Sequence, residues 1–493
     1  MIIFLLLIPL ITAIILLPQP QKTRWQFAIN LGGSIVQLGM AVYCFSQVRL
    51  NGITTLQIGG WPAPFGITLV ADMFSMVMVM LSAIIAVSVS VYSFEGISRE
   101  HVNSRYYALL QFMLMGINGA FLSGDLFNLY VWFEVLLIAS FGLISLNGTR
   151  QQFAASFKYV AINMIGSLMF LTALGLIYGI TGTLNMADLA RKVALSEGNF
   201  YLQSTSLLLM TAFGIKAAIF PLYFWLPASY HTAPIPITAV FAGLLTKVGV
   251  YSLIRVFTLI FTGDMDFTHH LLLILGILTM VIGVLGAAVQ SDFRRILSIH
   301  IISQIGYMIL GLALFSPLAL AGAVFYLIHN IIVKSNLFLI AGIVQRLKGR
   351  FDVYALGGVY EQFPWITALF FISAFSLSGV PPLSGFWAKL FIIKAGLDLQ
   401  AYVSVAAALA VSLMTLFSMT KIWAQVFWKN EPREKAADDV PAKLPLTLLL
   451  PVAGLCTLII LIGIGAGTIL DISFEAGNQL LDRSGYIRAV LGD

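Results

Sequence analysis

The chain has 493 residues, of which 59% are hydrophobic and only 10% are charged, and its formal net charge is +6. Its mean hydropathy is +0.96. This composition excludes a soluble globular domain and predicts an all-α polytopic membrane protein, because a β-barrel would show alternating segments of roughly ten residues instead of long apolar runs. The positive charge lies in loops and within apolar runs. It therefore indicates a lipid bilayer as the surrounding partner and no nucleic acid.

The first apolar run occupies residues 1–18. It lacks the basic segment and the small-residue cleavage site of a signal peptide, so we expect a retained first transmembrane helix. Both cysteines, Cys44 and Cys456, lie inside apolar runs and do not indicate a disulfide framework. The sequence has no Cys/His cluster with metal-ligand spacing and no glycine-rich phosphate loop. We therefore expect no metal site, no cofactor and no enzymatic activity.

Apolar runs long enough to cross a bilayer follow one another along the whole chain, and they predict about fourteen transmembrane helices. Short polar breaks separate the fourth run from the fifth at residues 123–125, and the tenth from the eleventh at residues 316–317. The predicted centres, in chain order, are Pro9, Gln37, Val79, Met115, Leu137, Phe170, Phe213, Thr246, Val281, Met308, His329, Gly379, Leu413 and Ile459.

Basic residues distinguish the two sides of this arrangement. Fifteen lie in one set of alternate loops, against five on the opposite side, so the first set is predicted to be cytoplasmic and both termini are predicted to lie outside. The fifteen are Lys22, Arg24, Arg99, Arg105, Arg150, Lys158, Arg294, Arg295, Arg346, Lys348, Arg350, Lys429, Arg433, Lys435 and Lys443. The five are Arg49, Arg191, Lys192, Arg483 and Arg488.

One long polar connection runs from Trp428 to Pro445, and we expect it to be a solvated cytoplasmic loop. The tail after Asp471 is short, and the sequence shows no soluble domain and no appended long helix. A single membrane domain over residues 1–493 is therefore predicted.

Two of the predicted helices are interrupted by glycine and proline. The seventh is broken around Gly214–Pro221 and carries Lys216, and the twelfth is broken around Gly379–Gly385 and carries Lys389. Five crossings separate them, so a repeated five-helix unit must insert in the opposite sense, which is typical of transporters with two inverted repeats and discontinuous helices. The expected divisions are residues 1–105 (helices 1–3), 106–262 (first repeat), 263–428 (second repeat) and 429–493 (loop, helix 14 and tail).

Lysines inside apolar runs are the strongest functional signal. A charged side chain at bilayer depth costs roughly 2.5–3.5 kcal/mol on insertion scales, yet Lys216 and Lys247 follow each other in successive runs. The alternative, that they extend to the membrane surface, is disfavoured by their mid-span positions. Glu134 is the acid well inside a predicted span. It is expected to pair with Lys216 as a switchable proton donor, or otherwise to be a neutral carboxyl bonded to a neighbouring helix.

Further candidates lie in later spans. Lys334 shares a helix face with Asn330, whereas His329 points elsewhere and could equally be a core histidine with a satisfied ring. Lys389 follows the second helix break. His231, in the turn after the seventh span, could take up protons at physiological pH or could be structural.

Other charged and aromatic residues have a structural interpretation. Asp72 is expected to cap a helix or anchor a loop, Arg255 and Lys421 to be structural, and Lys394 to reach the membrane surface. The tryptophans Trp225, Trp365, Trp387 and Trp428 are expected to be packing or interface residues.

Three motifs, in order, resemble one known family: GIKAAIFPLYFWLPASYHTAPIPITAVFAGLLTKVGVY, DFRRILSIHIISQIGYMILG at residues 292–311 and GVPPLSGFWAK at residues 379–389. They are similar to the antiporter-like membrane subunits of complex I, a family that includes the large subunits of Mrp (Mnh) multisubunit sodium/proton antiporters. The length, the short carboxyl terminus and HNIIVKSNLFLIAG resemble the D-type branch of the Mrp subunits. Complex I relatives usually carry histidine where Asn330 stands, and a lysine at Lys389 resembles the D-type branch rather than one of the complex I subunits.

The resemblance implies fourteen helices, two inverted repeats and a mid-membrane row of charged groups containing Glu134, Lys216, Lys247, Lys334 and Lys389. It also implies a proton-translocating subunit that works with other antiporter subunits in the cell membrane and is coupled to Na⁺. Two alternatives remain open. One is a proton-pumping subunit of a redox complex of the complex I or membrane-bound hydrogenase kind, and the other is a non-conducting structural subunit.

Overall fold

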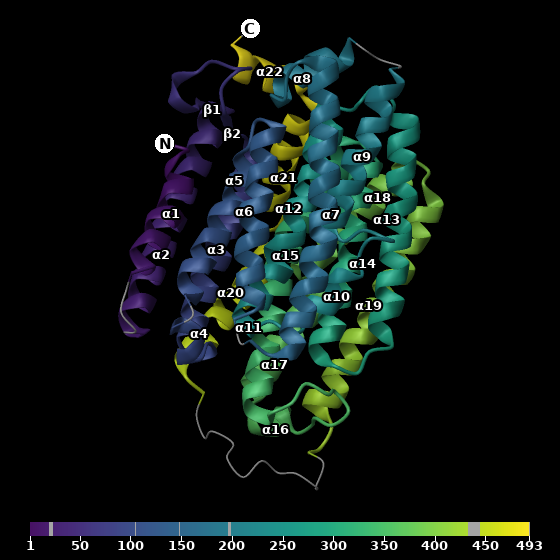
Figure 1. Cartoon of the computed structure of the whole chain (residues 1–493). Helices are drawn as coiled ribbons and strands as arrows, with labels where there is room; N and C mark the ends of the chain where they lie inside the picture. Colours follow the sequence, from purple (N-terminus) through teal and green to yellow (C-terminus); the bar gives the residue numbers. More distant parts are fainter. Residues whose placement is uncertain (19–22, 104, 147, 196–198, 432–443, 493) are drawn as a thin grey trace.

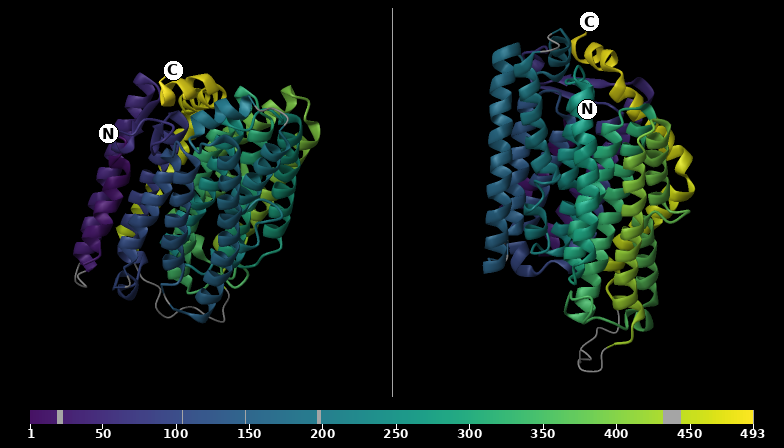
Figure 2. Two further views of the ribbon diagram at one scale, coloured as in Figure 1. Left: turned by 45° about the horizontal axis from the view of Figure 1, so that its top comes forward. Right: turned by 90° about the vertical axis from the view of Figure 1, so that its right-hand side faces the viewer.

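The computed structural model describes residues 1–18, 23–103, 105–146, 148–195, 199–431 and 444–492. Its helices run side by side as a bundle, with both termini toward the same end (Figure 1; Figure 2). A helix pairs its backbone N–H and C=O groups within one segment, which is the arrangement that a bilayer without water requires.

The first half of the chain contains the following elements, in order: α1 (Phe4–Leu16), α2 (Thr23–Asn51), β1 (Thr54–Gln57), the 3₁₀ turn η1 (Ile58–Gly60), β2 (Thr68–Ala71), α3 (Met73–Gly96), α4 (Arg99–Asn103), α5 (Tyr106–Leu122), α6 (Leu126–Ile144), α7 (Arg150–Thr181), α8 (Met186–Ala194), α9 (Phe200–Ala217), α10 (Trp225–Ser229), α11 (Ile235–Val240), the π-helical turn η2 (Phe241–Leu245) and α12 (Thr246–Leu259).

The second half continues with α13 (Met265–Ala288), α14 (Phe293–Ala313), α15 (Pro317–Lys348), α16 (Val359–Gln362), α17 (Pro364–Ser378), α18 (Ser384–Asp398), α19 (Tyr402–Ile422), the π-helical turn η3 (Trp423–Trp428), α20 (Leu446–Ile464), α21 (Ala466–Leu481) and α22 (Arg483–Leu491).

In the part of the chain that the structure describes, ten helices are long and apolar enough to cross a membrane, and α1, α5 and α17 are shorter apolar helices. This confirms an all-helical polytopic membrane protein. Every predicted span centre lies inside a helix except Gly379, which lies at the predicted break between α17 and α18. The two short polar breaks are also where they were predicted, between α5 and α6 and between α14 and α15.

Helix α15 forms the centre of the bundle. The apolar part of this helix is buried all around, and it packs against α14, α18, α20 and α21. Beside it, α13 and α14 approach closely because Gly283 leaves no side chain between the backbones: a Cβ there would lie 2.5 Å from the Ser303 nitrogen. Small residues permit such contacts between membrane helices.

Two features differ from the sequence-based expectation. First, β1 and β2 form an antiparallel hairpin, with Thr54 opposite Ala71 and Gln57 opposite Thr68, in a chain predicted to be purely helical. Second, the segment after the last predicted span, for which the sequence predicted only a short tail, forms the two short helices α21 and α22; α21 packs against α15 and α3, and α22 packs against α8. Weak local hydrophobicity hid both features, because tertiary contacts rather than bilayer insertion stabilise them.

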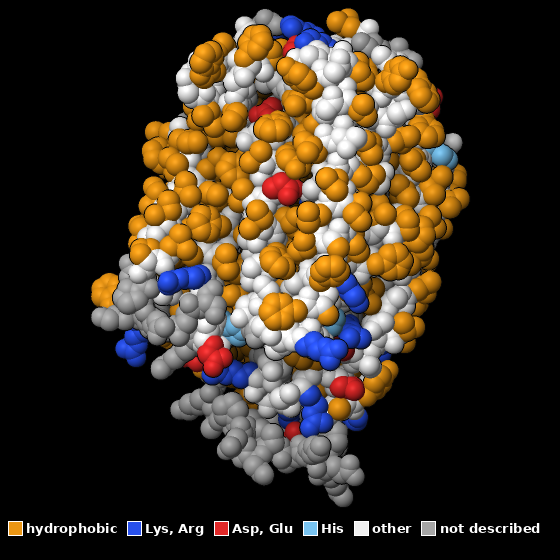
Figure 3. Space-filling view, in the orientation of Figure 1, with side chains coloured by type: hydrophobic (Ala, Val, Ile, Leu, Met, Phe, Trp, Pro, Cys, Tyr) orange, Lys and Arg blue, Asp and Glu red, His pale blue; other side chains and the backbone are white. Residues whose placement is uncertain are grey.

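Most of the polar connection predicted between Trp428 and Pro445 lies outside the described residues, as do Lys22, Arg433, Lys435 and Lys443. Figure 3 shows a broad hydrophobic surface on one face, with lysine and arginine side chains gathered at the end opposite the termini. We call this the basic end of the bundle.

Candidate functional site: a row of buried amines

The first helix break places Lys216 in the last turn of α9. The helix ends at Ala218, whose φ of 62° is left-handed, and regular helix resumes only at α10. Pro221 in the gap has no N–H with which to continue the helical ladder. The Ile215 carbonyl accepts a hydrogen bond of 2.9 Å from the Trp225 indole, so α10 is tied back to the end of α9.

Lys216 is buried, and its ammonium has a neutral hydrogen-bond partner. The Nζ donates to the Ser167 hydroxyl of α7 at 2.9 Å and lies 5.5 Å from the centre of the Phe133 ring of α6. Glu134, the next residue on α6, is half-buried and within electrostatic range, yet these two described side chains form no ion pair. The Glu134 Oε1 has no hydrogen-bond partner. The predicted pair is therefore a long-range electrostatic interaction and not a contact.

Lys247 is fully buried at the start of α12, directly after the π-helical turn η2. Its Nζ donates to the Ala242 carbonyl within that turn at 2.5 Å. Helices α9 and α12 lie in contact here because Gly249 has no side chain: a Cβ there would lie 2.8 Å from the Lys216 carbonyl carbon. The two lysines predicted to act in succession therefore lie on directly packed helices.

Lys334 lies in the middle of the central helix α15 and is fully buried. Its Nζ donates to the Leu297 carbonyl of α14 at 3.2 Å, and it lies within electrostatic range of Lys247. Asn330, one turn earlier, is fully buried, and neither its amide nitrogen nor its amide oxygen has a protein partner.

The second helix break places Lys389 against the free end of α17. That helix ends at Gly379, with φ 90°, and α18 begins at Ser384. The Lys389 Nζ donates to the Ser378 carbonyl at 2.9 Å and to the Ser412 hydroxyl of α19 at 3.0 Å. A Cβ at Gly379 would lie 2.9 Å from the Lys389 side chain, so glycine is what permits this approach.

His329 is bonded on one side and open on the other. Its Nδ1 is 2.9 Å from the Ser384 hydroxyl at the start of α18, and its Nε2 has no partner. It lies within electrostatic range of both Lys334 and Lys389. The structure thus brings His329 within electrostatic range of two of the predicted lysines, although it lies on a different face of α15 from Lys334.

His300 of α14 is a candidate that the sequence analysis missed. It is fully buried, neither ring nitrogen has a hydrogen-bond partner, and it lies within electrostatic range of Lys334 and Lys389. Unpartnered Ser303 Oγ and Gln304 Nε2 follow on the same helix. The histidine in the SIHIISQIGYM motif was a signal in the sequence, but helix periodicity alone could not show that it is buried within electrostatic range of these lysines.

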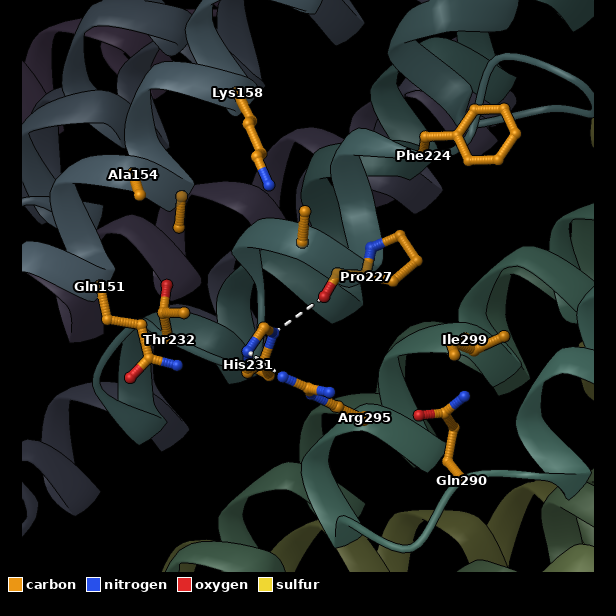
Figure 4. Close-up of a pocket in the computed structure, with 12 residues that line it drawn as sticks. Gln151, Ala154, Lys158, Phe224, Pro227, His231, Thr232, Gln290, Arg295 and Ile299 are labelled. Atoms are coloured by element: carbon orange, nitrogen blue, oxygen red, sulfur yellow. Dashed lines mark hydrogen bonds between the residues drawn. The ribbon is translucent and has the colours of Figure 1, made fainter.

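His231 lies apart from this row, in a cavity at the basic end between α7, the α10 turn and α14 (Figure 4). Its Nδ1 is 2.8 Å from the Pro227 carbonyl, and the Arg295 Nη2 lies 3.4 Å from its Nε2. Burial, followed by the charges of Arg295 and Arg294, lowers the pKa of His231, while the Pro227 hydrogen bond and the Asp292 charge oppose this shift.

The residues expected to be structural have structural contacts. Asp72 caps α3 through the Ser75 N–H and forms a buried ion pair of 2.6 Å with Arg255. Lys421 donates to two carbonyls at the end of α13, and Lys394 is exposed. Among the described residues, no group of three or more His, Cys, Asp or Glu is arranged to hold a metal ion.

Buried amines on discontinuous, packed membrane helices are the features of an ion-translocating membrane protein. Comparison with known proteins agrees with this class. The family described as "NADH:quinone oxidoreductase/Mrp antiporter, TM" matches residues 123–415, which hold every member of the row.

Two curated relatives match nearly the whole chain. The D-type subunit of the Na⁺/H⁺ antiporter of Alkalihalophilus pseudofirmus is 47% identical over 99% of this chain and 98% of its own length. The corresponding Na⁺/H⁺ antiporter protein of Bacillus subtilis, also of the D type, is 40% identical over 99% and 98%.

Solved structures have the same fold. A chain of the Mrp complex from Dietzia sp. superposes with a TM-score of 0.92 at 32% identity, over 100% of this chain and 99% of that one. A chain of the membrane-bound sulfane sulfur reductase, an archaeal respiratory membrane complex, gives a TM-score of 0.91 at 28% identity, over 99% of each chain. The chain belongs to the NADH:quinone oxidoreductase/Mrp antiporter transmembrane family, in the branch of the D-type antiporter subunits. It is a transporter component rather than an enzyme.

Proposed function

We propose that this chain is the proton-translocating D-type subunit of an Mrp-type Na⁺/H⁺ antiporter. The antiporter relatives that match its whole length support cation/proton antiport within a multisubunit complex. Proton movement through this particular chain rests on its row of buried amines.

We infer fourteen membrane crossings. Ten long helices, the three shorter apolar helices and the lysine-bearing helix α9 supply them. Discontinuities in the seventh and twelfth crossings support two inverted five-helix repeats over residues 106–262 and 263–428. The gathering of basic residues at one end supports a cytoplasmic location for that end, with both termini outside.

The observation that carries the proposal is the shortage of hydrogen-bond partners along the row. An ammonium has three N–H donors, whereas Lys216, Lys247 and Lys334 each have one hydrogen-bond acceptor among the residues that the structure describes. Near Lys334 and Lys389, both ring nitrogens of His300, the Nε2 of His329 and both amide atoms of Asn330 also have no hydrogen-bond partner among the described residues. Buried polar atoms of this kind are normally satisfied by ordered water, so a hydrated lateral connection fits this region.

In the proposed mechanism, protons arrive through a half-channel near Lys216 and Lys247 and move through water around Lys334 and His300. They leave through a second half-channel at Lys389. Lysine suits this role because burial can bring its protonation into a usable range, whereas arginine stays charged. Glu134 tunes Lys216 electrostatically, since a nearby negative charge favours the charged amine. Inward proton flow would drive Na⁺ export by the assembled complex.

The test replaces Glu134 or Lys216 with alanine in the assembled complex and measures Na⁺-dependent pH change in everted vesicles. Both variants are expected to lose most of the transport, at unchanged complex abundance. Lys394→Ala is the matched control, because this exposed lysine lies on α18 outside the row. Undiminished transport in the Glu134 and Lys216 variants would remove the proposal.

A second candidate is a proton-pumping component of a redox-driven complex. The close structural match to a chain of the archaeal respiratory complex favours it, because the fold is shared by both kinds of assembly. Purification of the tagged chain and identification of its co-purifying proteins separates the two: small antiporter subunits support the first, and a redox module supports the second. A purely structural subunit would not need the buried lysines.

A further inference from the structure

A cavity of about 440 Å³ opens at the basic end of the bundle, where α7, the α10 turn and the start of α14 meet. Three basic side chains line it: Lys158, His231 and Arg295. None of the described lining residues is acidic. The remaining polar lining comes from Gln151, Thr232 and Gln290. Figure 4 shows Lys158 and Arg295 reaching in from opposite sides, with His231 between their helices. The cavity therefore suits an anion.

The position of the cavity indicates which kind of anion. Phe224 lines it and is 64% exposed on the outer surface, so an apolar rim borders the cationic interior. Figure 3 shows lysine, arginine and histidine side chains directly below the hydrophobic surface of this face. In a bilayer, the border between an apolar surface and charged side chains lies at the level of the lipid headgroups. A ligand with a phosphate and attached acyl chains matches both the interior and the rim. Inorganic phosphate matches the interior alone.

The contacts of His231 link this cavity to proton exchange at the basic end. Because a carbonyl can only accept, the bond to Pro227 places the proton of the ring on Nδ1. The Nε2 then accepts from the Arg295 guanidinium at 3.4 Å and cannot take a proton while Arg295 stays there. The other charged groups near the ring are Arg294 and Asp292 of α14 and Lys158 of α7. Asp292 is already engaged as the cap of α14, bonded to the Arg295 N–H.

We propose that this cavity binds the phosphate of an anionic glycerophospholipid between Lys158 and Arg295, and that the bound phosphate frees His231 Nε2 by taking over Arg295. A phosphate offers the guanidinium two parallel charge-assisted hydrogen bonds, which a single ring nitrogen cannot match. The proposal of lipid binding depends only on the cavity and its lining. The release of His231 as a group that exchanges protons with the cytoplasmic side rests on the proposed function.

The binding half is tested on the assembled, tagged complex. Detergent-purified complexes are incubated with phosphatidylglycerol, and bound lipid is measured by native mass spectrometry. Each cation near an anionic phosphate contributes about fivefold in affinity, so the Lys158→Gln/Arg295→Gln double variant is expected to bind about 25-fold more weakly. Arg150→Gln, an exposed position on the same helix outside the cavity, controls for general loss of positive charge. Equal binding by wild type and the double variant, or an equal loss in Arg150→Gln, would overturn the lipid site.

The switch half is tested by transport in vesicles of phosphatidylethanolamine, with or without an equimolar amount of phosphatidylglycerol. The anionic lipid is expected to move the alkaline limb of the pH profile of the wild-type complex to higher pH. Arg295→Gln is expected to show the shifted limb without anionic lipid, and His231→Ala to show no lipid response. An unshifted profile in Arg295→Gln would overturn the switch and leave lipid binding standing.

A third arm adds inorganic phosphate to vesicles without phosphatidylglycerol. Inorganic phosphate is expected to leave the pH profile unchanged. A full shift of the alkaline limb would show that free phosphate, and not a lipid, is the ligand.

A complex that retains the lipid but transports no protons would contradict the proposed function and leave the binding site intact. A density map of the complex with a neighbouring protein filling the cavity would overturn the lipid proposal.

Discussion

The two helix breaks hold their lysines in different ways. Lys216 precedes its break and has one neutral acceptor, the Ser167 hydroxyl, with the half-buried Glu134 within electrostatic range. Lys389 follows its break and has two acceptors, the Ser378 carbonyl and the Ser412 hydroxyl. The ammonium of Lys389 therefore caps the end of a broken helix, where carbonyls lack intrahelical partners and the helix dipole is negative.

The sequence around the breaks shows why they are not equivalent. Pro221-Leu222 in the first corresponds to Pro382-Leu383 in the second, and a tryptophan follows each pair. The Trp225 indole donates to Ile215 just before its own break, whereas the Trp387 indole donates to Gly463 at the end of α20. The tryptophan of the first break therefore bonds to the helix that precedes the same break, whereas the tryptophan of the second break bonds to a different helix, α20. One lysine thus has a carboxylate within electrostatic range, and the other is bonded to a carbonyl at a helix end and to a hydroxyl.

The largest expected effect is the loss of Lys389. Both Lys389→Ala and Lys389→Arg are expected to lower Na⁺-dependent pH change in everted vesicles by about 100-fold or more, since arginine keeps the charge but cannot release its proton. If the lysine only capped α17, arginine would restore activity. Recovery of Na⁺-dependent transport in Lys389→Arg would therefore show that Lys389 has only a structural role at the second break.

The next largest effect concerns Glu134, the carboxylate within electrostatic range of Lys216; among the described residues no carboxylate acts on Lys389 in this way. Glu134→Gln is expected to slow transport about tenfold, because it removes the charge that favours protonated Lys216 while keeping the shape of the side chain. Glu134→Asp should recover part of the rate under the same assay. A Glu134→Gln complex as fast as wild type would show that both lysines work without a carboxylate, and the contrast between the breaks would disappear.

A smaller difference is expected between the two serine partners. Ser167→Ala removes the hydrogen bond that Lys216 has to the protein, worth about 1 kcal/mol, and is expected to slow transport about fivefold. Ser412→Ala leaves Lys389 with the Ser378 carbonyl and should cost about twofold or less. Initial rates in everted vesicles at matched expression give the comparison, and the reverse order would contradict it.

The smallest expected effect is on folding stability and concerns His231, at the basic end of the bundle. The pKa of His231 is lowered by burial and by Arg295, so below its ordinary value of about 6.5 the unfolded chain binds more protons than the folded one. Folding stability is therefore expected to fall as the pH decreases through that value toward the lowered pKa. His231→Gln should flatten this part of the pH dependence in thermal unfolding of the complex, and an unchanged slope would show that the ring does not contribute.

The sequence was enough to predict the long apolar helices, the two breaks and the buried lysines. Insertion of each segment into a bilayer depends mainly on its own composition, and glycine and proline interrupt helices through their local backbone chemistry. This is why Lys216, Lys247, Lys334 and Lys389 could be selected before any helix was placed. The capping role of Asp72 followed from similar local reasoning.

Only the tertiary structure decided which groups these residues contact. It separates Glu134 from direct contact with Lys216, gives Lys334 the Leu297 carbonyl, and buries His300 within electrostatic range of Lys334 and Lys389. It also forms the β1–β2 hairpin and folds α21 against α15, although neither segment is marked by strong hydrophobicity. The physical reason is that a hydrogen-bond partner on another helix depends on the packing of the two helices. Sequence spacing along one helix does not contain that information.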